Sequence, residues 1–145
     1  MSEAALSGSC LCGAVRFSAV PEKPAMDACH CAMCRRWGSG PVMTVTCARL
    51  EIADKRALGV YSSSEWAERC FCKECGASLF WRMKDGGFIA VNAHAFDEPV
   101  SYPFTVEIYV DQKPATYAFA DVPKQMTGAE VEAMFAAKGE GEGGA

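Results

Sequence analysis

The segment CHCAMC, residues 29–34, and the segment CFCKEC, residues 70–75, each place three cysteines at the spacing C-x-C-x-x-C. A shorter pair, CLC at Cys10 and Cys12, lies upstream of both. In an extended segment, residues two apart point to the same side, so both thiols of C-x-C can face one ion, whereas C-x-x-C wraps a tight turn around it. Gly76, directly after the second segment, favours such a turn. The motifs therefore predict a fold organised by bound metal.

The composition is that of a single folded domain. A chain of 145 residues buries about two thirds of its unfolded surface and needs no disulfides to fold. Half of the residues are hydrophobic and 22% are charged, which is typical of a globular protein rather than a disordered one. The net charge of -4 and the scattered Lys and Arg residues argue against nucleic acid as a partner.

The start of the chain and its cysteines favour a cytoplasmic protein. The first residues include an acid and no apolar stretch, unlike a signal peptide, and no window reaches the roughly 18 apolar residues of a membrane helix. We therefore expect no membrane partner. In a reducing compartment thiols stay free unless a metal holds them, and an odd count of nine clustered cysteines argues against a disulfide framework. Metal binding is the favoured interpretation.

The pattern along the chain predicts a mainly β domain with one helix at its end. Runs rich in β-branched and aromatic residues are separated by glycine and proline. The predicted strands lie at 10–20, 42–46, 58–61, 66–71, 78–81, 88–92 and 106–110. Thr127 and Glu130 form a possible capping box for a helix that Gly139 would end. We expect a domain over residues 1–138 and a flexible tail over 139–145.

Counting ligands suggests two unequal sites. Four thiolates complete a tetrahedron, which in a cytosolic protein favours zinc over iron. Cys10 and Cys12 need two more ligands, which either longer segment could supply. If Cys72 and Cys75 supply them, three cysteines remain as a second site with one open position, the arrangement of a catalytic zinc. These three are Cys29, Cys31 and Cys34.

Four other residues leave alternatives open. Cys47 follows an apolar run and fits a buried small hydrophobe, and Cys70 could be a spectator or a fifth thiol near the first ion. The second site could instead be closed by His30, Cys47 or His94, which would remove a catalytic role. Strand alternation predicts that His30 points outward, away from the ion, and nothing near His94 has ligand spacing, so we assign it no role.

Arg35 and Arg36 follow the first long segment directly and are candidate substrate-binding residues. Three thiolates on a divalent zinc leave a net negative charge that guanidinium groups offset, and they can also bind a substrate carboxylate in a bidentate way. The alternative is two solvated arginines at the start of a turn. Trp37 to Gly40 could line a pocket or form an ordinary loop.

Three segments in this order resemble the glutathione-dependent formaldehyde-activating enzyme family, which also includes the centromere protein V domain. They are GSCLCGAVRF (Gly8–Phe17), CHCAMCRRWGSG (Cys29–Gly40) and FCKECGASLF (Phe71–Phe80). The resemblance extends from about residue 7 to about residue 125. Near the last strand, where the family often carries His-Ile-Phe, this chain reads Glu107-Ile-Tyr109.

The resemblance implies a single β-tent domain of stacked, short antiparallel sheets, stabilised by zinc. It implies a structural zinc on Cys10, Cys12, Cys72 and Cys75. It implies a second zinc on Cys29, Cys31 and Cys34. The activity implied is formation of S-(hydroxymethyl)glutathione from glutathione and formaldehyde, a carbon-sulfur lyase reaction with a small thiol as the substrate.

Three functional hypotheses follow. The first is a zinc-dependent carbon-sulfur lyase acting on a thiol-aldehyde adduct, with glutathione or another thiol. The second is a non-catalytic zinc-binding module whose ions only hold short strands together. The third, thiol redox chemistry through Cys31 and Cys34, is disfavoured because such pairs lie at a helix start within a thioredoxin-like pattern, which we do not find in the sequence.

Overall fold

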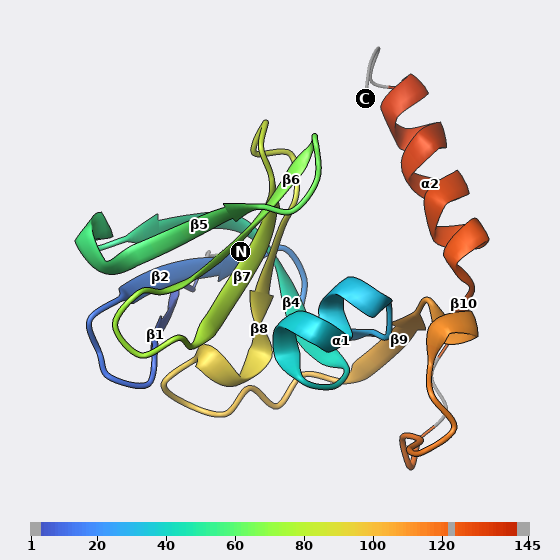
Figure 1. The fold of residues 1–145 in the computed structure, drawn as a ribbon, viewed down its shortest axis with the longest axis horizontal. Helices are drawn as coiled ribbons and strands as arrows, with labels where there is room; N and C mark the ends of the chain where they lie inside the picture. The colour runs from blue at the N-terminus through green and yellow to red at the C-terminus, as the bar shows by residue number, and fades with distance from the viewer. Residues whose placement is uncertain (1–3, 122–123, 142–145) are drawn as a thin grey trace. The chain divides into compact units, whose positions relative to one another are not determined.

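The computed structural model describes residues 4–121 and 124–141, with side chains as far as Ala137 in the last helix. The chain forms two compact units. Unit 1 comprises Met1–Met26 and Met43–Pro103, and unit 2 comprises Asp27–Val42 and Phe104–Ala145. Strands make up most of the regular structure, and a long helix lies at the C-terminal end (Figure 1). The predicted mainly β fold class with a C-terminal helix is confirmed.

Unit 1 is built on an antiparallel sheet with the strand order β1-β2-β4-β8-β7-β6-β5. The strands are β1 (Leu6–Ser9), β2 (Arg16–Pro21), β4 (Val42–Ile52), β5 (Leu58–Ser62), β6 (Ala67–Cys72), β7 (Ser78–Met83) and β8 (Ile89–Asn92). Short 3-10 turns are η1 (Lys55–Ala57) and η2 (Ala93–Ala95). The strands predicted from 42 to 92 coincide with β4 to β8, although β4 runs further than expected.

The strand predicted at 10–20 is only half formed, because β2 begins at Arg16. Cys10 to Val15 form the loop between β1 and β2, in which the Cys10 N–H donates to Val15 O at 3.0 Å. Gly13 in this loop has a φ of 84°, a conformation that glycine adopts at little cost. Cys10 and Cys12 therefore lie in a turn, and strand alternation was the wrong reason for pairing them.

The core of unit 1 is apolar and also contains buried cysteines. The largest apolar side chains that are fully buried are Phe80, Leu79, Val15, Val45 and Val91. Burying a side chain of this kind contributes about 1.5–3 kcal/mol. Cys47 and Cys70 pack in the same cluster, as expected for small hydrophobic residues.

Unit 2 contains two helices and short strands. Its elements are β3 (Met26–Cys29), α1 (Ala32–Gly38), β9 (Phe104–Ile108), the 3-10 turn η3 (Val110–Gln112), β10 (Lys124–Met126) and α2 (Gly128–Gly141). β9 pairs in parallel with β10 and neighbours β3. The predicted strand at 106–110 corresponds to β9, whereas β3, β10 and α1 were not predicted.

The helix α1 begins after Cys31, whose sulfur accepts a hydrogen bond from the Cys34 N–H, and ends at Ser39 in the left-handed conformation. Arg35 and Arg36 therefore lie in a helix rather than at the start of a turn. Seven residues are too few to show a helical period, which explains why the sequence pattern did not reveal α1.

The C-terminal helix α2 begins as predicted. The Thr127 N–H donates to Glu130 Oε1 at 2.8 Å, and the Glu130 N–H donates to Thr127 Oγ1 at 3.2 Å, which is a capping box. The helix does not stop at Gly139 but continues to Gly141, because glycine lowers helix propensity without by itself ending a helix. Residues 142–145 of the expected flexible tail lie outside the described residues, and the domain limits stay a prediction.

Among the described helices, none combines the length and the apolar character needed to cross a membrane.

Candidate metal centres

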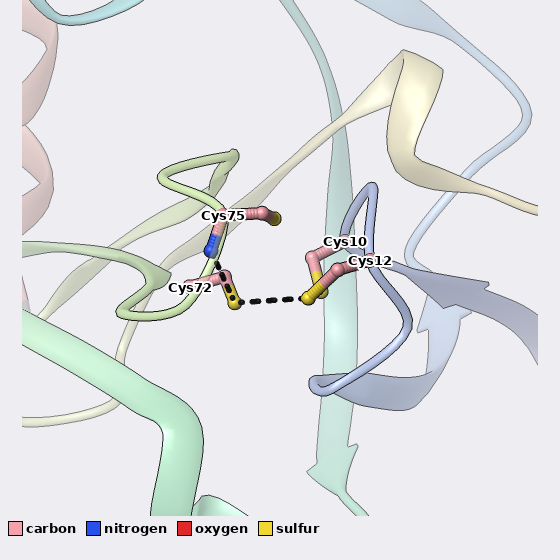
Figure 2. Close-up of side chains that lie close together, drawn as sticks. All are labelled: Cys10, Cys12, Cys72 and Cys75. Atoms are coloured by element: carbon pink, nitrogen blue, oxygen red, sulfur yellow. Dashed lines mark hydrogen bonds between the residues drawn. The ribbon is translucent and has the colours of Figure 1, made fainter.

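The first cysteine cluster joins two loops of unit 1. Cys10 and Cys12 come from the loop between β1 and β2, Cys72 ends β6, and Cys75 lies in the turn between β6 and β7 (Figure 2). Their four sulfur atoms lie within 4.8 Å of one another. The Cys10–Cys12 and Cys12–Cys72 sulfur distances are 3.7 Å and 3.8 Å. Four sulfurs around a zinc ion are about 3.8 Å apart, so the cluster has the dimensions of a tetrahedral thiolate site.

Backbone N–H groups surround the sulfurs of this cluster. The Val15 N–H donates to Cys10 Sγ at 3.3 Å, and the N–H groups of Glu74 and Cys75 donate to Cys72 Sγ at 3.3 and 3.4 Å. Such donors stabilise thiolates, which are the form that binds metal. Both loops therefore present sulfurs that are already solvated by the backbone.

A glycine in the left-handed region follows each cysteine pair. Gly13 has a φ of 84° and Gly76 a φ of 80°. The Gly76 N–H donates to Cys72 O at 2.8 Å, which closes the turn that carries Cys75. A side chain at either position would be strained. The turn predicted from Gly76 is confirmed, and Gly13 is its counterpart in the other loop.

The thiols of the first cluster do not ionise alike. Hydrogen bonds from the Ala77 and Cys12 N–H groups lower the pKa of Cys75 to about 6. The Ala14 N–H lowers the pKa of Cys12, but desolvation and the neighbouring sulfurs outweigh it and raise that pKa to about 11. Four thiolates at this spacing repel one another, so a cation is required to hold them together.

The second cysteine cluster lies in unit 2, where β3 meets α1. Cys29 ends β3, Cys31 is the N-cap of α1 and Cys34 lies in its first turn. The three sulfurs lie within 4.8 Å of one another. The Cys31 N–H donates to Cys29 Sγ at 3.5 Å and the Cys34 N–H to Cys31 Sγ at 3.4 Å. Among the described residues, no fourth Cys, His, Asp or Glu side chain joins this trio.

The trio also needs a cation to be ionised. Hydrogen bonding with Cys31 and Cys34 and then burial raise the pKa of Cys29 far above its ordinary value. Since a bound divalent ion would reverse this repulsion, the donor set fits a thiophilic metal. Both clusters can therefore hold a metal ion, and each draws its ligands from one unit.

The helix start at Cys31 corrects one premise of the sequence analysis. Thiol redox chemistry was disfavoured because the C-x-x-C pair was not expected at a helix start, yet Cys31 and Cys34 lie at the start of α1. Their helix has seven residues, and Cys29 contributes a third sulfur to the same group. Three converging sulfurs are the pattern of a metal site rather than of a dithiol pair.

The histidines join neither cluster. His30 is fully buried, and its ring nitrogens pair with Glu107 and Tyr117. It points away from the trio, as alternation predicts, but into protein rather than outward to solvent. His94 is exposed on η2, and among the described residues it belongs to no metal-ligating group.

The spare cysteines are spectators. Cys47 and Cys70 are buried and belong to neither cluster. Burial raises the pKa of Cys47 to about 12 and the pKa of Cys70 to about 11. His30, Cys47 and His94 do not join the trio. The described residues therefore do not form the alternative second site in which one of these side chains is the fourth ligand.

The two candidate substrate-binding arginines differ in their surroundings. Arg35 is half-buried, and its Nε donates to His30 O at 3.0 Å. Arg36 is exposed in the last turn of α1. Arg35 thus holds the backbone between Cys29 and Cys31, whereas Arg36 faces solvent. Their contact with substrate stays a prediction.

Sequence reasoning missed the partners of His30. Glu107 is buried on β9, in the short alternating run FTVEI. A charged residue at a buried strand position requires a partner, and that was the available signal. The partner lies 77 positions away in the chain, so spacing could not identify it.

Comparison with known proteins agrees with this geometry. The model of the family described as "Glutathione-dependent formaldehyde-activating enzyme" matches residues 5–112. The chain belongs to this family. A member from Schizosaccharomyces pombe, described as an uncharacterized lyase, is 36% identical over 126 residues, which cover 86% of this chain and 92% of the yeast protein.

The fold also has a counterpart among solved structures. The crystal structure of a Rhodobacter sphaeroides protein superposes with a TM-score of 0.56 and 23% identity, covering 69% of this chain and all of the other. At this identity the likeness concerns the fold alone. The formaldehyde-activating family assignment therefore rests on the sequence match and on the cysteine motifs, and the structure supplies the arrangement of those motifs.

Proposed function

We propose that this chain is a zinc-dependent carbon-sulfur lyase that acts on the adduct of a small thiol and an aldehyde, with glutathione and formaldehyde as the pair. The structural zinc would be held by Cys10, Cys12, Cys72 and Cys75. The second zinc would be held by Cys29, Cys31 and Cys34. The observation that carries the proposal is this trio, which converges without a fourth protein ligand among the described residues.

The reaction needs no oxidant or reductant. A bond forms between the thiol sulfur and the aldehyde carbon, and the proton lost by the thiol ends on the former carbonyl oxygen; the reverse direction breaks the same bond. A zinc ion on the trio would supply Lewis acidity and a position at which a thiol is favoured as thiolate. The three cysteines would hold this ion at the start of α1.

Residues beside the trio provide positive charge and order. Arg35 donates to the His30 carbonyl and so fixes the loop between two ligands. Arg36 presents an exposed guanidinium in the same helix, suited to a substrate carboxylate. Glutathione carries two carboxylates. Holding both reactants at one site supplies a proximity effect, which is the main contribution required because thiols add to formaldehyde readily.

The comparisons support the general class of reaction in the proposal, a lyase reaction. The family description names glutathione and formaldehyde, and the yeast relative is described as a lyase. A non-catalytic zinc module is the competing function, and it requires the second cluster to be structural only.

The first test is metal content and exchange. We expect about two zinc ions per chain, from one four-sulfur and one three-sulfur site. NMR exchange spectroscopy of glutathione with formaldehyde should show faster interconversion with protein than without it. Cys31→Ser should lose this acceleration and one zinc while staying folded.

A matched variant controls for loss of a thiol. Cys47→Ala removes a buried cysteine that belongs to neither cluster, so it should keep both zinc ions and the full rate. Equal exchange with and without wild-type protein would exclude the glutathione reaction. Unchanged exchange in Cys31→Ser would favour the structural module.

A further inference from the structure

His30 lies between the proposed ligands Cys29 and Cys31 without belonging to the second cluster, and its contacts hold it in place. His30 is fully buried, although it lies at the junction of β3 and α1. Its N–H donates to Ile108 O at 3.1 Å, and its carbonyl accepts from Arg35 Nε at 3.0 Å. The backbone of this residue is therefore fixed to β9 on one side and to α1 on the other.

The side chain of His30 is fixed as well. Its Nε2 lies 2.7 Å from Glu107 Oε1 and its Nδ1 lies 2.9 Å from the Tyr117 hydroxyl. An ionised carboxylate only accepts hydrogen bonds, so Nε2 donates to Glu107, and Nδ1 pairs with the hydroxyl. Both ring nitrogens are used, which leaves neither for a metal.

Glu107 and the His30 ring make further contacts with neighbouring side chains. Glu107 is 3% exposed, and its second carboxylate oxygen accepts from Gln125 Nε2 at 3.2 Å. The Tyr117 and Phe119 rings lie 5.6 Å and 5.8 Å from the His30 ring, at interplanar angles of 36° and 49°. A buried hydrogen-bonded pair of this kind is costly to break, because either partner alone would be left desolvated without its hydrogen bonds.

We propose that His30, held by Glu107 and Tyr117, is a positioning residue that sets the geometry of the Cys29, Cys31 and Cys34 metal site. Each neighbouring residue is a ligand, so a shift of His30 displaces both sulfurs. Metal sites depend in this way on partners that touch the metal only through a ligand. The inference rests on the proposed metal role of the trio, but not on the identity of the substrate.

The test measures zinc affinity of the two clusters by competition with a chromogenic chelator, in the full chain and without substrate. Glu107→Ala should weaken zinc binding at the trio by about 10-fold, the low end of the range for partners that bond a ligand directly, because Glu107 acts through His30; the four-sulfur site should not change. Tyr117→Phe should cause a smaller loss at the same site. Glu107→Gln keeps an acceptor for Nε2 and should recover most of the affinity.

The absorption spectrum of bound Co²⁺ provides a second readout. Glu107→Ala should change the Co²⁺ bands of the trio, whereas a loss of stability alone would leave the spectrum of the folded fraction intact. Glu68→Gln is the control, because Glu68 forms a part-exposed ion pair with Arg82, at 2.7 Å, within unit 1. This control should change neither affinity nor spectrum at the trio.

Several outcomes would overturn the proposal. They are wild-type affinity and spectrum in folded Glu107→Ala or Tyr117→Phe, equal weakening in Glu68→Gln, or a trio that binds no metal in the wild type. If Glu107→Ala does not fold, Tyr117→Phe decides. Weakened zinc binding in a protein whose wild type does not accelerate the glutathione reaction would support the positioning role while refuting the proposed function.

Discussion

Single residues decide which cysteines can react. Cys47 and Cys70 are buried among apolar side chains, and burial raises their pKa values to about 12 and about 11. Because the thiolate is the nucleophile, neither should be alkylated by iodoacetamide at pH 8 in the zinc-loaded protein. Mass spectrometry should find both labelled only after denaturation. Cys75, whose pKa is lowered to about 6, should react once a chelator has removed zinc, and labelling of Cys47 in the folded protein at the rate of Cys75 would contradict this interpretation.

Arg36 is the residue at which substrate charge can be tested. Its exposed guanidinium would pair with a glutathione carboxylate, so Arg36→Ala should raise the KM for glutathione roughly fivefold, equivalent to about 1 kcal/mol for an exposed charge pair. The rate with 2-mercaptoethanol, which has no carboxylate, should not change. Arg56→Ala removes an exposed arginine from unit 1 and serves as control. An equal effect of Arg36→Ala on both thiols would exclude carboxylate binding.

Residue types with a fixed spacing could be predicted from the sequence, and residues joined only by folding could not. The two ligand sets are local pairs and a local trio, so spacing identified their members, and the choice of Cys72 and Cys75 for the first cluster came from family resemblance. The His30 pairings with Glu107 and Tyr117 join residues 77 and 87 positions apart. Strand alternation predicted that the His30 side chain points away from the two flanking cysteines. Its burial depends on the position of β9, which alternation cannot predict.

At the level of elements, two tight turns carry the first cluster. Gly76 has a φ of 80°, and a Cβ added at this position would meet open space. Gly76→Ala therefore introduces backbone strain without a steric clash. The left-handed conformation costs about 1–2 kcal/mol for alanine. We expect that strain to be relieved by opening the turn, which lowers zinc affinity at the first cluster. Chelator competition measures this change.

Gly86 offers a matched control for that prediction. Its φ is 81°, its surroundings are equally open, and it lies between β7 and β8 without a ligand nearby in the chain. Gly86→Ala should reduce the free energy of unfolding by a similar amount while leaving zinc affinity unchanged. If both variants lose zinc equally, general destabilisation rather than the turn geometry is responsible.

Elements were predictable where their composition or their end signals were distinctive. β4 to β8 show β-branched and aromatic runs bounded by turn residues, and α2 has a capping box, so all were found. Helix α1 has only seven residues, and β3 (MDAC) and β10 (KQM) contain no β-branched or aromatic residue, unlike the equally short β8 (IAVN). Helix α1 nevertheless carries the second cluster, so the sequence grouped the three cysteines without revealing the element that positions them.

At the scale of the whole molecule, a metal ion bound by the first cluster would act as a long-range cross-link within unit 1. Its loops belong to the β1–β2 and β6–β7 hairpins, which are separated in the sheet by β4 and β8. Cys12 and Cys72 are 60 positions apart in the chain, yet their sulfurs lie 3.8 Å apart. Closing a loop of this length by a metal restricts the unfolded chain and stabilises the folded one. The second cluster links residues only five positions apart, from Cys29 to Cys34, and offers no comparable restraint.

Removing each cluster should therefore have different consequences for folding. Cys72→Ser should leave β1–β2 and β6–β7 open to hydrogen exchange, detected by mass spectrometry as faster deuteration of peptides covering residues 6–21 and 67–83. A site whose free metal exceeds its Kd a thousandfold contributes about 4 kcal/mol to the free energy of unfolding, and losing that contribution is enough to unfold a marginal unit.

Cys31→Ser should change hydrogen exchange only near residues 27–42. Adding a chelator to this variant should reproduce the Cys72→Ser exchange pattern in unit 1. Cys70→Ala, which removes a buried thiol from the same strand, controls for packing and should respond to chelator as the wild type does. Slow exchange of residues 6–21 in metal-free protein would show that the hairpins hold together without the ion, and the cross-link would then have no structural role.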